Sequence, residues 1–125
     1  MSLKVLLVDD SGLARRSTRR VLENAGYTVV EADDGLSALE QFAVEKPDIV
    51  MLDLVMKGMY GLDVLTKLRQ IDASARVIVV SADVQHSSHE LVNQAGATAF
   101  LTKPLDADEI LALLRTTLSE APRCN

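Results

Sequence analysis

The sequence of 125 residues contains no tryptophan, and phenylalanine and tyrosine together supply only 3% of its residues. Its single cysteine is Cys124, so no disulfide can form within the chain. No apolar run approaches the roughly 20 residues that a membrane helix needs, and the N-terminus lacks a signal-peptide pattern. Because chains without disulfides are typical of reducing compartments, these absences predict a cytoplasmic protein. They argue against a disulfide-stabilised secreted domain and against a membrane protein.

Acidic residues outnumber basic ones. The chain has 18 aspartate and glutamate residues and 13 lysine and arginine residues, which gives a formal net charge of −5. Non-specific nucleic-acid binding requires a basic surface, so we expect no direct nucleic-acid contact. An acidic chain is compatible with a cluster of acids that holds a cation. With 48% apolar residues, we expect one globular domain over residues 1–119 and a tail at 120–125.

Short apolar runs alternate with segments of helical periodicity along the chain. A short, wholly apolar run is typical of a strand that is buried on both faces of a parallel sheet. Strict alternation therefore predicts an α/β fold, with helices on both faces of a five-stranded parallel sheet and right-handed crossovers. The expected strands cover residues 4–8, 27–31, 49–53, 75–80 and 97–101.

The first two expected helices carry apolar residues at helical spacing, and we expect these residues to face the sheet. They are Leu13, Val21 and Leu22 in the first helix and Leu36, Leu39, Phe42 and Ala43 in the second.

Polar residues stand where the strands end. Asp9-Asp10 follows the first strand, Asp53 ends the third, and Ser81 and Lys103 follow the fourth and fifth. In a parallel sheet these ends share one edge, where open α/β sheets place their ligands. Three converging carboxylates repel one another, and a divalent cation or a lysine relieves that repulsion. Oxygen ligands suit Mg²⁺, and a carboxylate beside an ammonium and a hydroxyl can attack a phosphoryl group in line.

Each of these residues alone has an ordinary structural interpretation. An acid pair after a strand is often a turn with a helix cap, and Asp53 alone would be a strand-end turn residue. Lys103-Pro104 alone is a loop, Ser81 would satisfy a strand end, and Phe100 would pack in the core. Their combination at four strand ends favours a phosphoryl-transfer site with Asp53 as the reactive carboxylate.

On these residues the chain resembles the receiver domain of two-component response regulators, over about residues 3–119. The matching features are Asp9-Asp10, Asp53, Ser81 and Lys103-Pro104 on a five-fold β/α chain. The resemblance implies a single flavodoxin-like (βα)5 domain with strand order 2-1-3-4-5. It also implies a signalling switch rather than an enzyme, with self-phosphorylation and slow autodephosphorylation at Asp53 alone.

The resemblance implies a role for each residue of the acidic site. Asp53 would accept a phosphoryl group from a histidine kinase or a phosphotransfer protein. Asp10 would bind Mg²⁺ or Mn²⁺ directly, and Asp9 would do so directly or through water. Asp53 and the backbone carbonyl of Val55 would complete the protein ligands. Lys103 would pair with Asp53 or with its phosphate.

The resemblance also implies an output. Ser81 would bond the phosphoryl group and move with it, and Phe100 would be an aromatic switch. The surface of the fourth helix, fifth strand and fifth helix would then dock a downstream protein target, or a phosphatase. The domain would be a monomer or a phosphorylation-dependent dimer. The arginines of the first helix are expected to form a solvated outward face, with docking of a phospho-donor or phosphatase as the alternative; they are Arg15, Arg16, Arg19 and Arg20.

The chain departs from the family pattern after the acceptor, where Met56-Lys57 replaces the usual Met-Pro. Val55 and Asp83 stand at positions that often tune phosphoryl lifetime. Three alternatives were weighed. The chain could be a receiver taken from a larger regulator, such as a transcription factor or hybrid kinase. An aspartyl-nucleophile phosphohydrolase needs a second acid where Val55 stands, and a flavodoxin would have its phosphate repelled by Asp9-Asp10.

Overall fold

The computed structural model describes residues 3–54, 61–81 and 96–119. The strands are β1 (Lys4–Val8), β2 (Thr28–Ala32), β3 (Ile49–Asp53), β4 (Val77–Ser81) and β5 (Ala99–Thr102). The described helices are α1 (Gly12–Asn24), α2 (Gly35–Glu45), α3 (Gly61–Ile71) and α5 (Ala107–Ser119).

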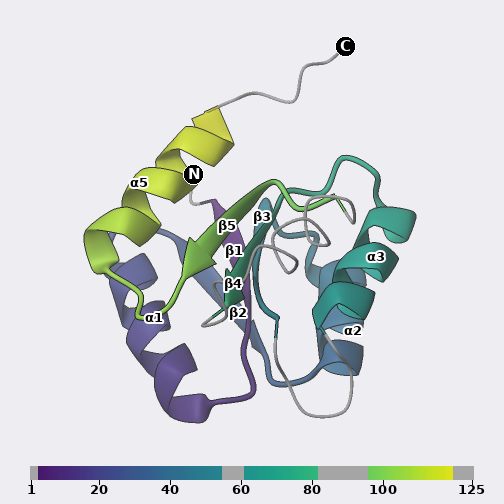
Figure 1. The fold of residues 1–125 in the computed structure, drawn as a ribbon, viewed down its shortest axis with the longest axis horizontal. Helices are drawn as coiled ribbons and strands as arrows, with labels where there is room; N and C mark the ends of the chain where they lie inside the picture. The colour runs from purple at the N-terminus through teal and green to yellow at the C-terminus, as the bar shows by residue number, and fades with distance from the viewer. Residues whose placement is uncertain (1–2, 55–60, 82–95, 120–125) are drawn as a thin grey trace.

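The five strands form one parallel sheet in the order β2-β1-β3-β4-β5. Figure 1 shows α1 and α5 against one face of this sheet and α2 and α3 against the other. The order and the two-sided covering are those of a flavodoxin-like fold. The expected fold class and strand order are therefore confirmed.

Successive residues of the central strands point into two separate apolar cores. On the face covered by α2 and α3, Leu6, Val50 and Val79 pack with the helix residues. On the face covered by α1 and α5, Met51 and Ile78 pack with theirs. All five residues of β3 and of β4 are buried. This two-sided burial is why these strands lack the polar alternation of a half-exposed strand.

The helices on both faces begin at side chains that satisfy free backbone amides. The Ser11 hydroxyl accepts a hydrogen bond from the amide of Ala14, and the Asp34 carboxylate accepts one from Ser37. Asp106 does the same for Glu109 at the start of α5. Such caps set where a helix starts, so they fix the lengths of the loops that leave the carboxyl edge of the sheet.

The expected apolar faces of α1 and α2 were partly wrong. Leu13 is 73% exposed and Leu36 is 64% exposed, and Ala43 is also exposed. At 3.6 residues per turn, Leu13 lies about half a turn from the buried Leu22, and Leu36 lies on the far side from the buried Ala38. Apolar character alone did not identify which residues of each helix share the phase of its buried face.

Within the described part of the chain, no helix combines the length and apolar character needed to cross a membrane.

Candidate functional site

Three carboxylates meet at the carboxyl edge of the sheet. β1 and β3 are neighbours, so Asp9 and Asp10 after β1 lie beside Asp53 at the end of β3. One carboxylate oxygen of each residue lies within 4.8 Å of one oxygen of the other two. Asp9 and Asp53 are only 8% and 7% exposed. The expected convergence of these acids is therefore present.

This donor set fits a hard divalent cation, because all three side chains offer oxygen ligands. The charges agree with that assignment. Three carboxylates and the ammonium of Lys103, which contacts two of them, leave two negative charges. A divalent cation held by these residues would neutralise them.

Lys103 brings an ammonium into the cluster from the loop after β5. Its Nζ donates a hydrogen bond to Asp53 Oδ2 at 3.1 Å and lies 3.8 Å from Asp9 Oδ2. Burial, the largest single effect, lowers the pKa of Lys103. The hydrogen bond to Asp53 and the charges of the three aspartates act the other way and together raise that pKa above its ordinary value. Lys103 therefore remains an ammonium beside the Asp53 carboxylate.

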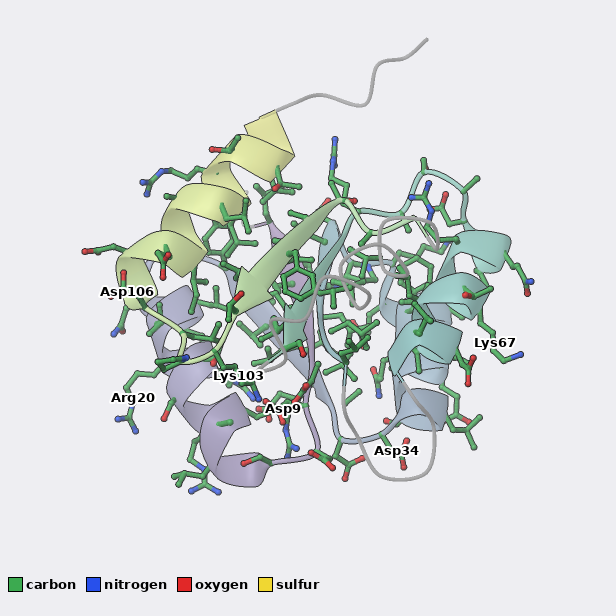
Figure 2. All side chains as sticks on the ribbon, in the orientation of Figure 1. Asp9, Arg20, Asp34, Lys67, Lys103 and Asp106 are labelled. Carbon is green, nitrogen blue, oxygen red and sulfur yellow. The ribbon has the colours of Figure 1, made fainter. Side chains whose placement is uncertain are left out.

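The backbone places Lys103 at this position. Its amide donates to the carbonyl of Ser81 at 2.9 Å, which ties the end of β5 to the end of β4. The Lys103–Pro104 peptide bond is cis, a feature that sequence reasoning did not predict. Figure 2 shows Lys103 and Asp9 close together at this edge of the sheet.

The two expected switch residues occupy neighbouring strands. Ser81 is the last residue of β4 and is 1% exposed. Its strand neighbour Val80 is in register with Asp53, so Ser81 lies one residue beyond the level of Asp53 on the adjacent strand. Phe100 lies on the edge strand β5 and is partly buried against the core beneath α2 and α3. The positions of both residues are therefore established, while their roles remain a proposal.

Three residues singled out in the sequence lie outside the described part of the chain. They are Val55, Lys57 and Asp83.

Sequence reasoning did not find the role of Gly61. Its amide donates to the carbonyl of Leu54 at 2.8 Å. A Cβ at this position would lie 2.6 Å from the Leu54 Cα and 2.7 Å from the Asp53 carbonyl oxygen. Glycine lets the start of α3 approach the end of β3 this closely. The only signal in the sequence is a glycine directly before the helically spaced Leu62, Leu65 and Leu68.

The four arginines of α1 were expected to face solvent, and this was wrong for the two that bond to another element of the fold. Arg15 and Arg19 both hydrogen bond to Glu31 on β2, and Arg15 also contacts the backbone of Asp9. Arg16 and Arg20 are exposed, as expected. The partner that Arg15 and Arg19 share, Glu31, comes from the second strand, so helical spacing on α1 could reveal only the Arg19–Glu23 pair.

Comparison with known proteins decides the family. The response regulator receiver domain model matches residues 5–115. The chain belongs to the response regulator receiver family. Receiver domains are signalling switches and generally not enzymes, which sets aside the phosphohydrolase alternative. They generally bind Mg²⁺ at an acidic pocket, and they interact with histidine kinases and downstream targets.

Individual relatives agree with this assignment. The chemotaxis protein CheY of Bacillus subtilis is 38% identical over 120 residues, covering 95% of this chain and 100% of CheY. The response regulator MprA of Mycobacterium ulcerans is 39% identical over 118 residues, covering 94% of this chain. The chain spans only 51% of that MprA, and thus about half of its length.

Solved receiver structures have the same fold. A CheY-like receiver domain protein from Methanospirillum hungatei superposes with a TM-score of 0.92 at 25% identity, covering 96% of each chain. Chemotaxis protein CheY4 of Vibrio cholerae gives a TM-score of 0.91 at 28% identity, covering 94% of this chain and 100% of CheY4.

Proposed function

We propose that this receiver domain is a phosphorylation-activated switch in which Asp53 accepts a phosphoryl group from a histidine kinase or a phosphotransfer protein. The observation that carries the proposal is the contact of the buried Asp53 carboxylate with the Lys103 ammonium, beside two further carboxylates. A buried acid in this setting has a fixed orientation and a nearby positive charge. These are the requirements for positioning a carboxylate nucleophile.

The proposed metal ligands are the carboxylates of Asp9, Asp10 and Asp53 and the backbone carbonyl of Val55. When bound, Mg²⁺ would supply positive charge that offsets charge on the phosphoryl oxygens. Asp9 and Asp10 approach from the β1 side, whereas Lys103 approaches from the β5 side. With Mg²⁺ held by these ligands, both the metal and Lys103 would supply positive charge beside Asp53.

The transfer is an in-line displacement at phosphorus. A carboxylate oxygen of Asp53 forms a bond to phosphorus, and the bond from phosphorus to the donor's imidazole nitrogen breaks. The electron pair of that bond leaves with the donor nitrogen. Lys103 carries a charge that can follow the phosphoryl oxygens, and Ser81 can donate a hydrogen bond to one of them.

We propose that the output is a change in a docking surface. Ser81 would move toward the phosphoryl group, and Phe100 on the adjacent strand would respond. β5 and α5 would present the altered surface, together with the fourth helix that the sequence predicts outside the described residues. Such a switch would bind a downstream protein or a phosphatase, as a monomer or as a phosphorylation-dependent dimer.

The decisive experiment measures phosphoryl uptake. The protein is incubated with Mg²⁺ and acetyl phosphate, and intact mass spectrometry should detect one added phosphoryl group. Asp53→Asn should take up none, whereas Asp108→Asn, an exposed aspartate on α5, should match the wild type. Equal labelling of Asp53→Asn would overturn the assignment of the acceptor.

A further inference from the structure

Arg15 connects the acidic site to the second strand. Its Nη1 donates a hydrogen bond to the backbone carbonyl of Asp9 at 2.6 Å, and its Nε donates to Glu31 Oε1 at 2.8 Å. The Arg15 side chain is 19% exposed and that of Glu31 is 28% exposed. Arg19 contacts the other oxygen of the same carboxylate. Glu31 is thus held on both oxygens, and it in turn orients Arg15.

We propose that Arg15, held by Glu31, is a positioning residue that sets the Asp9 backbone for cation binding at the acidic site. The inference rests on the proposed function, because it concerns the same cation. It goes further in assigning a role to a residue that touches neither the cation nor the acceptor carboxylate.

The contacts of Asp9 show what Arg15 adds. The Asp9 amide donates to the carbonyl of Ala32 at 3.2 Å, and Asp9 Oδ1 accepts from the amide of Ser11 at 2.9 Å. Asp9 Oδ2 lies toward Lys103 and the centre of the cluster. The carbonyl bonded to Arg15 is the remaining polar group of this residue. With it, the peptide planes on both sides of Asp9 are tied to the end of β2.

An arginine suits this task better than a lysine. The planar guanidinium donates in two fixed directions at once, whereas an ammonium is a compact charge on a flexible chain. Here one direction leads to a backbone carbonyl and the other to a carboxylate. If Arg15 loses its contact with Glu31, its guanidinium is no longer held in the orientation that reaches the Asp9 carbonyl.

The charges around Arg15 also favour a positioning role. Arg15, Arg19, Glu23 and Glu31 form one connected network. Two positive and two negative groups leave it neutral. An unpaired Arg15 would repel a cation bound beside Asp9, and Glu31 offsets that repulsion. The network therefore orients Asp9 without opposing the metal's charge.

The test measures Mg²⁺ affinity by isothermal titration calorimetry without any phosphoryl donor. Arg15→Gln and Arg15→Lys should each weaken Mg²⁺ binding by about tenfold, since outer-sphere partners of metal ligands contribute effects of that size. Glu31→Gln should weaken it less, because the amide oxygen can still accept from Arg15. Arg20→Gln is the matched control, since Arg20 is exposed on the same helix and points away from the sheet (Figure 2). It should bind Mg²⁺ as the wild type does.

A purely electrostatic role predicts the opposite result. Removing the charge in Arg15→Gln would then tighten Mg²⁺ binding, and Arg15→Lys would leave it unchanged. Either outcome overturns the positioning proposal, as does an affinity within twofold of the wild type for both variants. Thermal unfolding in EDTA, read beside the titrations, separates loss of fold from loss of affinity. If Arg15→Gln does not fold, Arg15→Lys and Glu31→Gln decide the question.

A kinetic readout keeps this inference separate from the proposed function. Labelling by acetyl phosphate is followed at increasing Mg²⁺ concentrations. Arg15 variants should need more Mg²⁺ for half-maximal rate while reaching the wild-type maximal rate. If the wild type is not labelled at Asp53, the proposed function fails. If it is labelled and the Arg15 variants show the same Mg²⁺ dependence as the wild type, the inference about Arg15 alone fails.

Discussion

Two charged clusters meet at Asp9 and differ in how their charges balance. The acidic cluster of Asp9, Asp10, Asp53 and Lys103 carries two negative charges in excess. The arginine–glutamate network of Arg15, Arg19, Glu23 and Glu31 is neutral. The first cluster gathers three carboxylates around one ammonium, whereas the second pairs two arginines with two glutamates.

Each cluster holds one group whose pKa is shifted in favour of its charged form. In the network, hydrogen bonds from Arg15 and then from Arg19 lower the pKa of Glu31, so its carboxylate form is favoured by folding. In the acidic cluster, the pKa of Lys103 is raised against the effect of its own burial. The aspartates there favour the positive charge of Lys103, and the same charges would favour a bound cation. The network should therefore stabilise the fold, and the acidic cluster should favour cation binding instead.

The strongest test of the comparison removes a proposed metal ligand. Asp10→Ala should abolish Mg²⁺-dependent labelling by acetyl phosphate, because it deletes a carboxylate oxygen from a three-carboxylate cluster. Intact mass spectrometry with and without EDTA measures this. Asp63→Ala, at an exposed aspartate on α3, is the control and should label normally. An unchanged labelling rate in Asp10→Ala would remove Asp10 from the site.

A steric change at the same edge should destabilise the fold without altering any charge. Gly61→Ala would place a methyl group 2.6 Å from backbone atoms of Leu54. A backbone segment cannot relieve such a clash by changing rotamer, as a side chain can. The expected loss in the free energy of unfolding is about 1–3 kcal/mol. Urea unfolding measures it. Stability equal to the wild type would show that α3 does not need this close approach.

The fold was predictable because its signals are local and repeated. The two central strands, β3 and β4, each run through four apolar residues before the polar residue that ends them, Asp53 in β3 and Ser81 in β4. Asp53 and Ser81 could be placed at one edge from chain order alone, since all strands of a parallel sheet end on the same side. The receiver resemblance then supplied the strand order, which periodicity cannot determine.

What could not be predicted depends on contacts between elements that are distant in sequence. Arg15 was taken for part of an outward face, because its partner Glu31 lies on another strand. Gly61 carried no mark of how closely Leu54 approaches it. Leu13 was assigned to the buried face because one exposed leucine cannot be told from a buried one until the phase of the helix is known.

A conservative change in the acidic cluster should stabilise the protein in the absence of metal. Asp10→Asn removes one of three like charges, and like charges held near one another disfavour the folded state. The expected gain in the free energy of unfolding in EDTA is on the order of 1 kcal/mol. Added Mg²⁺ should raise the unfolding temperature of the wild type, because a ligand of the native state stabilises it, and should raise that of Asp10→Asn less. A destabilised Asp10→Asn in EDTA would contradict the excess of negative charge.

The matching change in the arginine–glutamate network should have the opposite sign and the smallest size. Glu31→Gln should lower the free energy of unfolding at neutral pH by about 0.2–1 kcal/mol, the usual range for partly exposed ion pairs.

The effect of this change should depend on pH. Because folding lowers the pKa of Glu31, its contribution is fully present above the unfolded-state pKa of about 4.3. That contribution is lost as the pH falls through the lower folded-state value. The stability difference between wild type and variant should therefore vanish in acid, and added salt should reduce it at neutral pH. Urea unfolding across this pH range measures both effects, with Glu40→Gln, at an exposed glutamate on α2, as the control. A difference that persists unchanged in acid would mean that Glu31 stabilises the fold by packing rather than by its charge.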